Sequence, residues 1–304
     1  MMKKLMLAGA VLALTAGMGM AENLRMGTEG AYPPYNFVND KGQLDGFEIE
    51  LGNALCEKID AQCTWVKNDW DSIIPNLVAS NYDTIMAGMN ITDERKKSIA
   101  FSEAYTPPPP SAYLAKTADA DINGTVSAQT NTIQAAHVAE TGATLVEFAT
   151  GEETIAAVRN GEADAVFADK DFLAPFMKDS NGELVWVTGQ DNVSLGEGIG
   201  IGMRQSDTEL KARFDKAIEE MKADGSLDAL IGKWFGPEAK TFAAEAKAAA
   251  AAPAAAAPAA AAPAAAPAAA APAAAPAADA AAAPAAPAAS PAAAAPAPAA
   301  PASN

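Results

Sequence analysis

The sequence predicts an α/β protein of two lobes, built on two mixed or parallel sheets that are flanked by helices. Two observations carry this prediction. Short apolar runs alternate with helical patterns along the chain, and a proline run at 107–110 divides them into two series. Alternating strands and helices are typical of mostly parallel sheets that are covered on both faces. Each series, roughly 80–100 residues long, has the usual size of a domain.

The first series is expected to contain three strands and three helices. The strands are expected at Leu24–Thr28, Cys63–Val66 and Thr84–Met86, and the helices at Gly46–Ile59, Ser72–Ala79 and Asp93–Ile99.

The second series repeats this pattern. Its strands are expected at Gly124–Ala128, Leu145–Phe148 and Ala165–Ala168, and its helices at Ile133–Ala139, Glu153–Asn160 and from Phe172 onward.

Three further elements are expected after the second series. A glycine-punctuated strand covers Gly198–Met203. Ser206 and Glu209 have the spacing of a capping box, so they predict the start of a long helix that stops at Gly225. A last helix, Leu227–Phe235, is expected to close the folded part.

Both ends of the chain are expected to lie outside the fold. Residues 1–21 combine a short positive region, an apolar stretch and small residues ending at Ala21, which is typical of a secretory signal peptide. About a dozen apolar residues are too few for the ~20 that a membrane anchor needs. Residues 248–304 are rich in alanine and proline, which predicts a disordered tail. We therefore expect an exported protein cleaved near Ala21.

The composition excludes several classes of function. The chain has 21 Lys and Arg against 38 Asp and Glu, a net charge of −17. Such a surface repels phosphate backbones, so no nucleic acid is expected as a partner. One histidine and two cysteines leave little material for a metal site. No nucleotide-binding or catalytic-triad motif is present, so no cofactor is expected.

Cys56 and Cys63 lie seven residues apart, at the end of an expected helix and in the following strand. In an oxidising compartment such a pair can close a small loop as a disulfide. The alternative is two buried free thiols. A redox-active role is not expected, because the spacing is not Cys-x-x-Cys.

Several long runs resemble one known family. They are GTEGAYPPYNF at 27–37, DGFEIEL at 45–51, IMAGMNITDER at 85–95 and IAFS at 99–102. They are similar to the polar amino-acid-binding proteins of bacterial ATP-driven importers (solute-binding protein family 3). The similarity is greatest to the lysine/arginine/ornithine, histidine and opine branch, and it covers about residues 22–240. The Cys56/Cys63 spacing also resembles the disulfide of that branch.

The resemblance implies a periplasmic-binding-protein fold whose two lobes, joined by a two-strand hinge, close on a ligand. Lobe 1 would be 22–106 plus 202–240, and lobe 2 would be 107–201. The implied partners are a free amino acid and the membrane permease of an ABC importer, with the protein itself a monomer. Because prolines fix φ and lack N–H donors, the crossing at 107–110 is expected to be stiff. Closure would then bend near Gly200–Gly202.

Two charged residues match the family positions that hold the α-substituents of the ligand. Arg95 follows Ile91-Thr92 and offers a planar fork suited to a carboxylate. Asp169 ends an apolar strand, where carboxylates point into the crevice of α/β folds, and it would take the α-ammonium. The alternatives are an exposed arginine in a charged helix and a helix N-cap.

Five further residues are expected to contact the ligand. Asn131 and Thr132 precede an expected helix, whose N–H groups would attract the carboxylate. Ala87, Gly88 and Asn90 stand where the cationic branch often has serines, which leaves backbone groups as the expected contacts.

The side chain of the ligand is expected to meet three residues. Tyr32 and Trp70 match the two aromatic walls of the family, which can hold the stem and the charge of a lysine or arginine. Glu29 matches the acidic position that meets a cationic tip. The alternatives are core packing for the aromatic residues and a solvated surface acid for Glu29.

The resulting interpretation is a periplasmic solute-binding protein, not an enzyme. It is expected to capture an amino acid, most readily a cationic one (arginine, lysine, ornithine or histidine), and to deliver it to the importer. The first alternative is an enzyme on the same scaffold, such as a periplasmic dehydratase with Glu29 as general acid. The second is a structural or cell-wall protein, which rests only on the tail.

Overall fold

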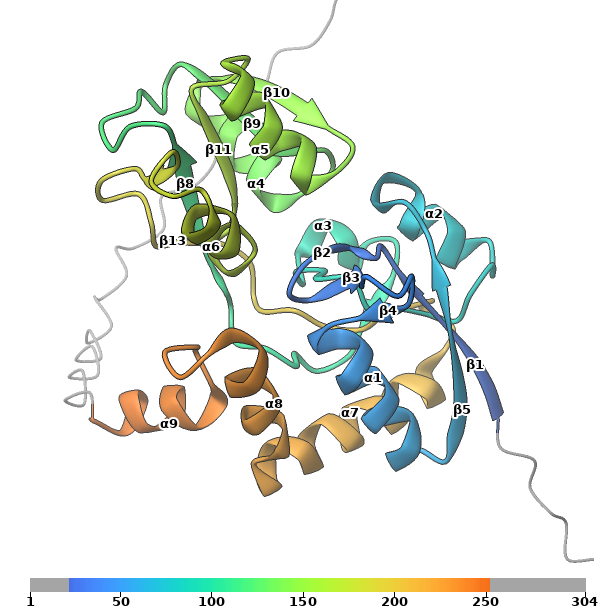
Figure 1. The fold of residues 1–304 in the computed structure, drawn as a ribbon. Helices are drawn as coiled ribbons and strands as arrows, with labels where there is room; N and C mark the ends of the chain where they lie inside the picture. Colours follow the sequence, from blue (N-terminus) through green and yellow to red (C-terminus); the bar gives the residue numbers. More distant parts are fainter. Residues whose placement is uncertain (1–21, 252–304) are drawn as a thin grey trace, which may run out of the picture. The chain divides into compact units, whose positions relative to one another are not determined.

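The computed structural model describes residues 22–251, with side chains described up to residue 247 (Figure 1). The expected signal peptide at 1–21 lies outside the described residues, as does the expected tail from 252 onward. Within the described residues, no helix is both long and apolar enough to cross a bilayer.

The first sheet is mixed and has the order β5-β1-β6-β14-β7. Its strands are β1 (Glu22–Thr28), β5 (Ala61–Lys67), β6 (Thr84–Ile85), β7 (Ala100–Phe101) and β14 (Gly202–Met203). β1 runs parallel to β5 and β6, whereas β14 is antiparallel to β6 and β7. Parallel neighbours need crossover connections, and the helices of this part supply them.

Helices surround this sheet as the alternating pattern predicts (Figure 1). They are α1 (Phe47–Lys58), the 3-10 turn η1 (Trp70–Ser72), α2 (Ile73–Val78), α3 (Asp93–Lys96), α7 (Thr208–Asp224) and α8 (Ser226–Phe235). A small antiparallel sheet of β2 (Ala31–Tyr32), β3 (Asn36–Val38) and β4 (Leu44–Asp45) precedes α1.

The second sheet has the order β10-β9-β11-β8-β12, and β13 also pairs with β8. Its strands are β8 (Pro110–Ala115), β9 (Thr125–Gln129), β10 (Thr144–Phe148), β11 (Ala165–Asp169), β12 (Val185–Trp186) and β13 (Val193–Ser194). Its helices are α4 (Ile133–Thr141), α5 (Gly151–Asn160) and α6 (Lys170–Asp179). β9, β10 and β11 are parallel, and β8 is antiparallel to β11.

The predicted fold class, α/β with two mixed sheets flanked by helices, is confirmed. Several elements were not predicted: the small sheet before α1, the turn η1, the short strands β7, β12 and β13, the buried strand β8, and α9 (Phe242–Ala251). β8 begins at Pro110, inside the run that was expected only to cross between lobes. Proline is tolerated there because it is the first residue of the strand.

The start of α7 differs from its prediction. The helix begins at Thr208 with Asp207 at the N-cap, and Ser206 donates its hydroxyl to the Asp207 carboxylate at 2.9 Å instead of capping the helix. The predicted capping box is therefore wrong. A true capping box occurs at α5, where Thr150 and Glu153 exchange both bonds.

α9 follows α8 because Asp228 accepts hydrogen bonds from the first free N–H groups of the new helix, at Phe242 and Ala243, both at 3.0 Å. The helix continues through Ala251, so the first four residues of the expected tail belong to it. This local anchoring satisfies donors that would otherwise be unpaired at the helix start.

The two chain passages between the sheets are paired with each other. Tyr105 donates its N–H to the carbonyl of Ile199 at 2.8 Å, and Thr106 forms a bridge with the same residue. Gly198 has φ +106°, and a Cβ there would lie 2.6 Å from the Thr106 carbonyl, so only glycine fits. This two-strand connection agrees with the predicted hinge, while the lobe boundaries at 106–107 and 201–202 stay predictions.

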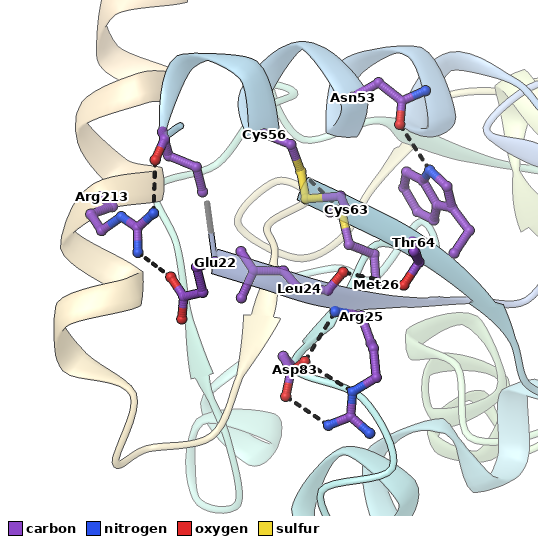
Figure 2. Close-up of a disulfide and its surroundings, with 12 residues drawn as sticks. Glu22, Leu24, Arg25, Met26, Asn53, Cys56, Cys63, Thr64, Asp83 and Arg213 are labelled. Carbon is purple, nitrogen blue, oxygen red and sulfur yellow. Dashed lines mark hydrogen bonds and ion pairs between the residues drawn. A yellow bond between two sulfur atoms is a disulfide. The ribbon is translucent and has the colours of Figure 1, made fainter. Parts of the chain in front are cut away.

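The predicted Cys56–Cys63 disulfide is confirmed over the alternative of free thiols. It joins the end of α1 to β5 with a Cα–Cα distance of 6.2 Å. Figure 2 shows it above β1, beside Leu24 and Met26, which are buried. The bond closes a short loop, and such cross-links stabilise a fold mainly by restricting the unfolded chain.

Candidate functional site

A small cavity lies where the ends of several strands from both sheets meet. Nine of the ten ligand-binding residues predicted from the sequence line it, and three further residues join them. The lining consists of Glu29, Tyr32, Trp70, Ala87, Gly88, Asn90, Arg95, Gln129, Thr132, Ile133, Gln134 and Asp169. The tenth predicted residue, Asn131, lines a larger neighbouring hollow together with Trp70 and Arg95.

Arg95 enters the cavity from the short helix α3. Thr92 caps this helix by accepting the Arg95 N–H at 3.2 Å. The guanidinium donates to the carbonyls of Asn90 (2.7 Å) and Asn131 (3.0 Å) and lies 5.3 Å from the centre of the Trp70 ring. Burial lowers the pKa of Arg95 to about 10, and the charge of Asp169 opposes that shift.

No carboxylate forms an ion pair with Arg95 within residues 22–247. Arg95 is only partly exposed and lines the cavity, so the alternative of an arginine exposed in a charged helix is wrong. Its neighbours Lys96 and Lys97 do match that description, since both bind surface acids. A desolvated guanidinium without a counter-ion is prepared for an anion.

Asp169 ends β11 and is 3% exposed. Its carboxylate accepts the Tyr32 hydroxyl at 2.9 Å and the Gln134 amide at 2.8 Å. Burial raises the pKa of Asp169 to about 7. The residue occupies the N-cap position of α6, but its side chain makes no capping bond and faces the cavity instead.

Glu29 follows β1 and is 4% exposed, so the alternative of a surface acid is wrong. Its carboxylate accepts the Gln129 amide at 2.7 Å, across from the second sheet. Burial raises the pKa of Glu29 to about 7. The cavity thus holds two buried carboxylates and one partly buried guanidinium.

The two aromatic walls contact both parts of the fold. Tyr32 stacks on Phe172 of α6, with ring centres 4.2 Å apart and planes 5° from parallel. Trp70 donates its indole N–H to the Thr130 carbonyl at 3.0 Å. Both rings are 8% exposed and still line the cavity. The structure therefore combines the predicted wall positions with packing across the cleft.

The loop before α4 places Thr132 and Asn131 differently. Thr132 caps the helix by accepting the Ala135 N–H at 3.1 Å and faces the cavity. Asn131 has φ +56°, and its carbonyl binds Arg95. Asn131 therefore contributes its main chain to the position of the guanidinium.

Ala87, Gly88 and Asn90 also line the cavity, but one of the main-chain groups expected to contact the ligand already has a partner. The Gly88 N–H donates to the carboxylate of Glu48 at 2.7 Å, so it is not free for a ligand. Asn90 is 3% exposed, and its side-chain oxygen has no partner within the described residues.

The model of the bacterial extracellular solute-binding proteins, family 3, matches residues 24–237. The chain belongs to this family. The match spans both sheets and every residue that lines the cavity.

Several relatives of this family 3 protein are binding proteins with stated ligands. A crystal structure of a periplasmic His/Glu/Gln/Arg/opine family-binding protein from Silicibacter pomeroyi, in complex with lysine, is 62% identical. It covers 72% of this chain and 100% of its own, with a TM-score of 0.71. The L-arginine-binding protein of Pseudomonas aeruginosa is 34% identical over 77% of this chain and 97% of its own length. The lysine/arginine/ornithine-binding periplasmic protein of Escherichia coli is 32% identical over 76% and 94%. These relatives favour a binding protein over the dehydratase alternative.

Three lining residues of this family 3 protein were missed in the sequence: Gln129, Ile133 and Gln134. Gln134 holds Asp169 and also donates to the Ser111 hydroxyl at 3.0 Å. An amide inside a helical pattern carries no local signal of such a role. Gln129 at the end of β9 offered one, because side chains at the carboxyl ends of parallel strands face the ligand crevice.

Proposed function

We propose that the protein captures a free cationic amino acid in this cavity. The observation that carries the proposal is a set of three charged groups that line the cavity without ionic partners: the buried carboxylates of Glu29 and Asp169 and the partly buried guanidinium of Arg95. Arg95 complements the carboxylate of the ligand, Asp169 its α-ammonium, and Glu29 a positive group at the end of its side chain. With all three ionised, the site has a net charge of −1, which matches the net charge of +1 on arginine, lysine or ornithine.

The walls of the cavity support the same ligand class. Tyr32 and Trp70 present aromatic surface between the two ends of the site, and aromatic faces hold both aliphatic stems and cations. The named relatives bind lysine, arginine or ornithine, which agrees with this charge arrangement.

The family supports a role for the protein in transport. We propose that residues 1–21 direct export and are removed near Ala21, and that the mature protein delivers its ligand in the periplasm to the permease of an ABC importer. The periplasmic names of relatives support this location.

A thermal-shift screen tests the ligand class. We expect arginine, lysine or ornithine to raise the unfolding midpoint most among the twenty amino acids, ornithine, citrulline and opines, because a ligand that binds only the folded state stabilises it. Recovery of the ligand unchanged after incubation separates binding from dehydratase activity. A screen in which no amino acid raises the midpoint contradicts the proposal.

Selectivity for a charged side chain is expected to depend on Glu29. We expect Glu29→Gln to weaken binding of arginine or lysine roughly tenfold or more, because a hydrogen bond to a charged group contributes about 1.5–3 kcal/mol. Binding of glutamine, if measurable, should be spared. Calorimetry with both ligand types checks this. Undiminished arginine binding in the variant would show that Glu29 does not meet the cationic group.

Ligand capture is expected to close the two lobes about the paired crossings. The bend of the second crossing was expected near Gly200–Gly202, but Gly202 lies within β14. We therefore expect the bend nearer Gly196 and Gly198, whose φ values are +70° and +106°. The neighbouring prolines at 107–110 keep the other crossing stiff. Small-angle scattering should show a smaller radius of gyration with saturating ligand. Superimposable curves would exclude lobe closure.

A further inference from the structure

Glu48 is a buried carboxylate outside the cavity, and its contacts extend to three parts of the cavity frame. It lies in the first turn of α1 and is 0% exposed. One oxygen accepts the Asn36 amide at 2.7 Å. The other accepts the Gly88 N–H at 2.7 Å and the Tyr105 hydroxyl.

Each of these partners controls a different segment. Gly88 itself lines the cavity and has φ +63°. Asn36 passes the contact on by accepting the N–H of Gly30 at 2.7 Å, the residue next to Glu29. Tyr105 lies in the first crossing and binds Ile199 of the second through its main chain. One carboxylate thus joins the Glu29 loop, the cavity wall and the hinge.

Both carboxylate oxygens of Glu48 must act as hydrogen-bond acceptors. Asn36, Gly88 and Tyr105 all act as donors toward Glu48, which an ionised carboxylate satisfies without a proton of its own. Burial raises the pKa of Glu48, and the three donors oppose that shift because they favour the ionised form. Position near the N-terminus of α1 also favours a negative charge.

We propose that Glu48 is a positioning residue for ligand binding, which sets the backbone at Gly30 and Gly88 and ties both to the crossing through Tyr105. The expected effect on ligand affinity rests on the proposed function, whereas the hydrogen-bond network around Glu48 does not depend on it. Glu48 does not line the cavity and acts through its three partners.

The isosteric variant Glu48→Gln breaks the network in a defined way. An amide can accept at one position only, so its NH₂ must face either the Asn36 amide or the Gly88 N–H. If Asn36 rotates to accept from it, Gly30 loses its acceptor. In every arrangement, at least one buried N–H group is left without an acceptor, either on the main chain at Gly30 or Gly88 or on the two facing side-chain amides, which is costly.

A second substitution restores every bond. In the double variant Glu48→Gln/Asn36→Asp, the new carboxylate at position 36 accepts from both Gly30 and the new amide at position 48. The oxygen at position 48 then accepts from Gly88 and Tyr105. The buried charge moves to the neighbouring side chain, and the total charge of the protein is unchanged.

The experiment compares the wild type, both variants and a control by calorimetry with L-arginine and L-lysine. We expect Glu48→Gln to lower affinity roughly tenfold, as for one lost bond to a charged group. The double variant should return to within about twofold of the wild type, the usual error of additivity. The control is Glu50→Gln on the same helix, whose carboxylate binds Lys233 and Trp234 away from the cavity. It should bind as the wild type does.

Amide NMR of the ligand-free proteins supplies a readout that does not need a ligand. The Gly30 or Gly88 amide resonance should move in Glu48→Gln and return in the double variant. If the single variant does not fold, Tyr105→Phe removes only the hydroxyl. It should weaken binding about threefold while leaving the Gly30 amide in place.

Two outcomes overturn the positioning role: a double variant that binds as poorly as Glu48→Gln, or a single variant with unchanged affinity and amide resonances. A wild type that binds neither amino acid refutes the proposed function instead, and the amide resonances then decide the network alone.

Discussion

Asp169→Asn is expected to abolish most binding of every amino acid while leaving the ligand-free protein at least as stable. The α-ammonium is common to these ligands, so the loss of affinity on removing the Asp169 charge should not depend on the side chain of the ligand. Breaking a buried charge pair in a complex typically costs about 2–5 kcal/mol, which is at least a 30-fold fall in affinity. Arg95→Ala should have a comparable effect through the ligand carboxylate.

The stability of the ligand-free variant separates binding from folding. Asp169 is buried with a raised pKa, so its ionised form is unfavourable in the empty cavity, and the neutral amide removes that cost above pH 7. Chemical denaturation should show an unchanged or higher free energy of unfolding for Asp169→Asn at pH 8. Calorimetry measures the affinities.

Two controls match these substitutions. Lys96→Ala removes a neighbouring cation of α3 that binds Asp93 and Glu197 on the surface. Asp191→Asn removes an acid that pairs with Lys170 outside the cavity. Both should bind as the wild type does. Near-wild-type affinity in Asp169→Asn or Arg95→Ala would remove that residue from the proposed site.

Ligand binding is also expected to weaken steeply below neutral pH. Burial raises the pKa of both Glu29 and Asp169 to about 7 in the empty protein. A cationic ligand favours their ionised forms, so protons compete with it. Two pH units below its pKa, a carboxylate is about 1% ionised, so affinity should fall roughly 100-fold per group between pH 8 and pH 5.

The sign of the stability effect is opposite in the ligand-free protein. Both carboxyl groups hold their protons to a higher pH when folded than when unfolded. The folded state therefore binds more protons between about pH 4 and 7, and the contribution of these groups to stability falls as the pH rises through that window. Saturating ligand should offset this loss.

Calorimetry between pH 5 and 8 in two buffers of different ionisation enthalpy tests this linkage. Near pH 7 we expect a net release of about one proton on arginine binding, half from each carboxyl group. Glu29→Gln should release about half as many. An affinity that does not change with pH, or heats that do not depend on the buffer, would show that neither group changes its protonation on binding.

Local patterns in the sequence determined the fold class, and the resemblance to a family supplied most of the candidate site. The spacing of apolar residues over a short stretch of chain predicts which residues are buried and whether they form a strand or a helix. This prediction needs no contact with distant segments. The end of an apolar strand at Asp169 and the cysteine spacing at 56 and 63 are signals of the same kind. The resemblance of the 85–95 run added Arg95, whose own charged surroundings point to the surface.

Pairing between distant segments was decided only by the tertiary structure. Glu29 meets Gln129, and Tyr32 meets Phe172 and Asp169, because the ends of two sheets pack together. The sequence around a glutamate does not predict whether its side chain is solvated, as that of Glu94 is, or buried, as that of Glu29 is. The difference arises because burial and hydrogen bonding depend on groups about 100 residues away, which no local period contains.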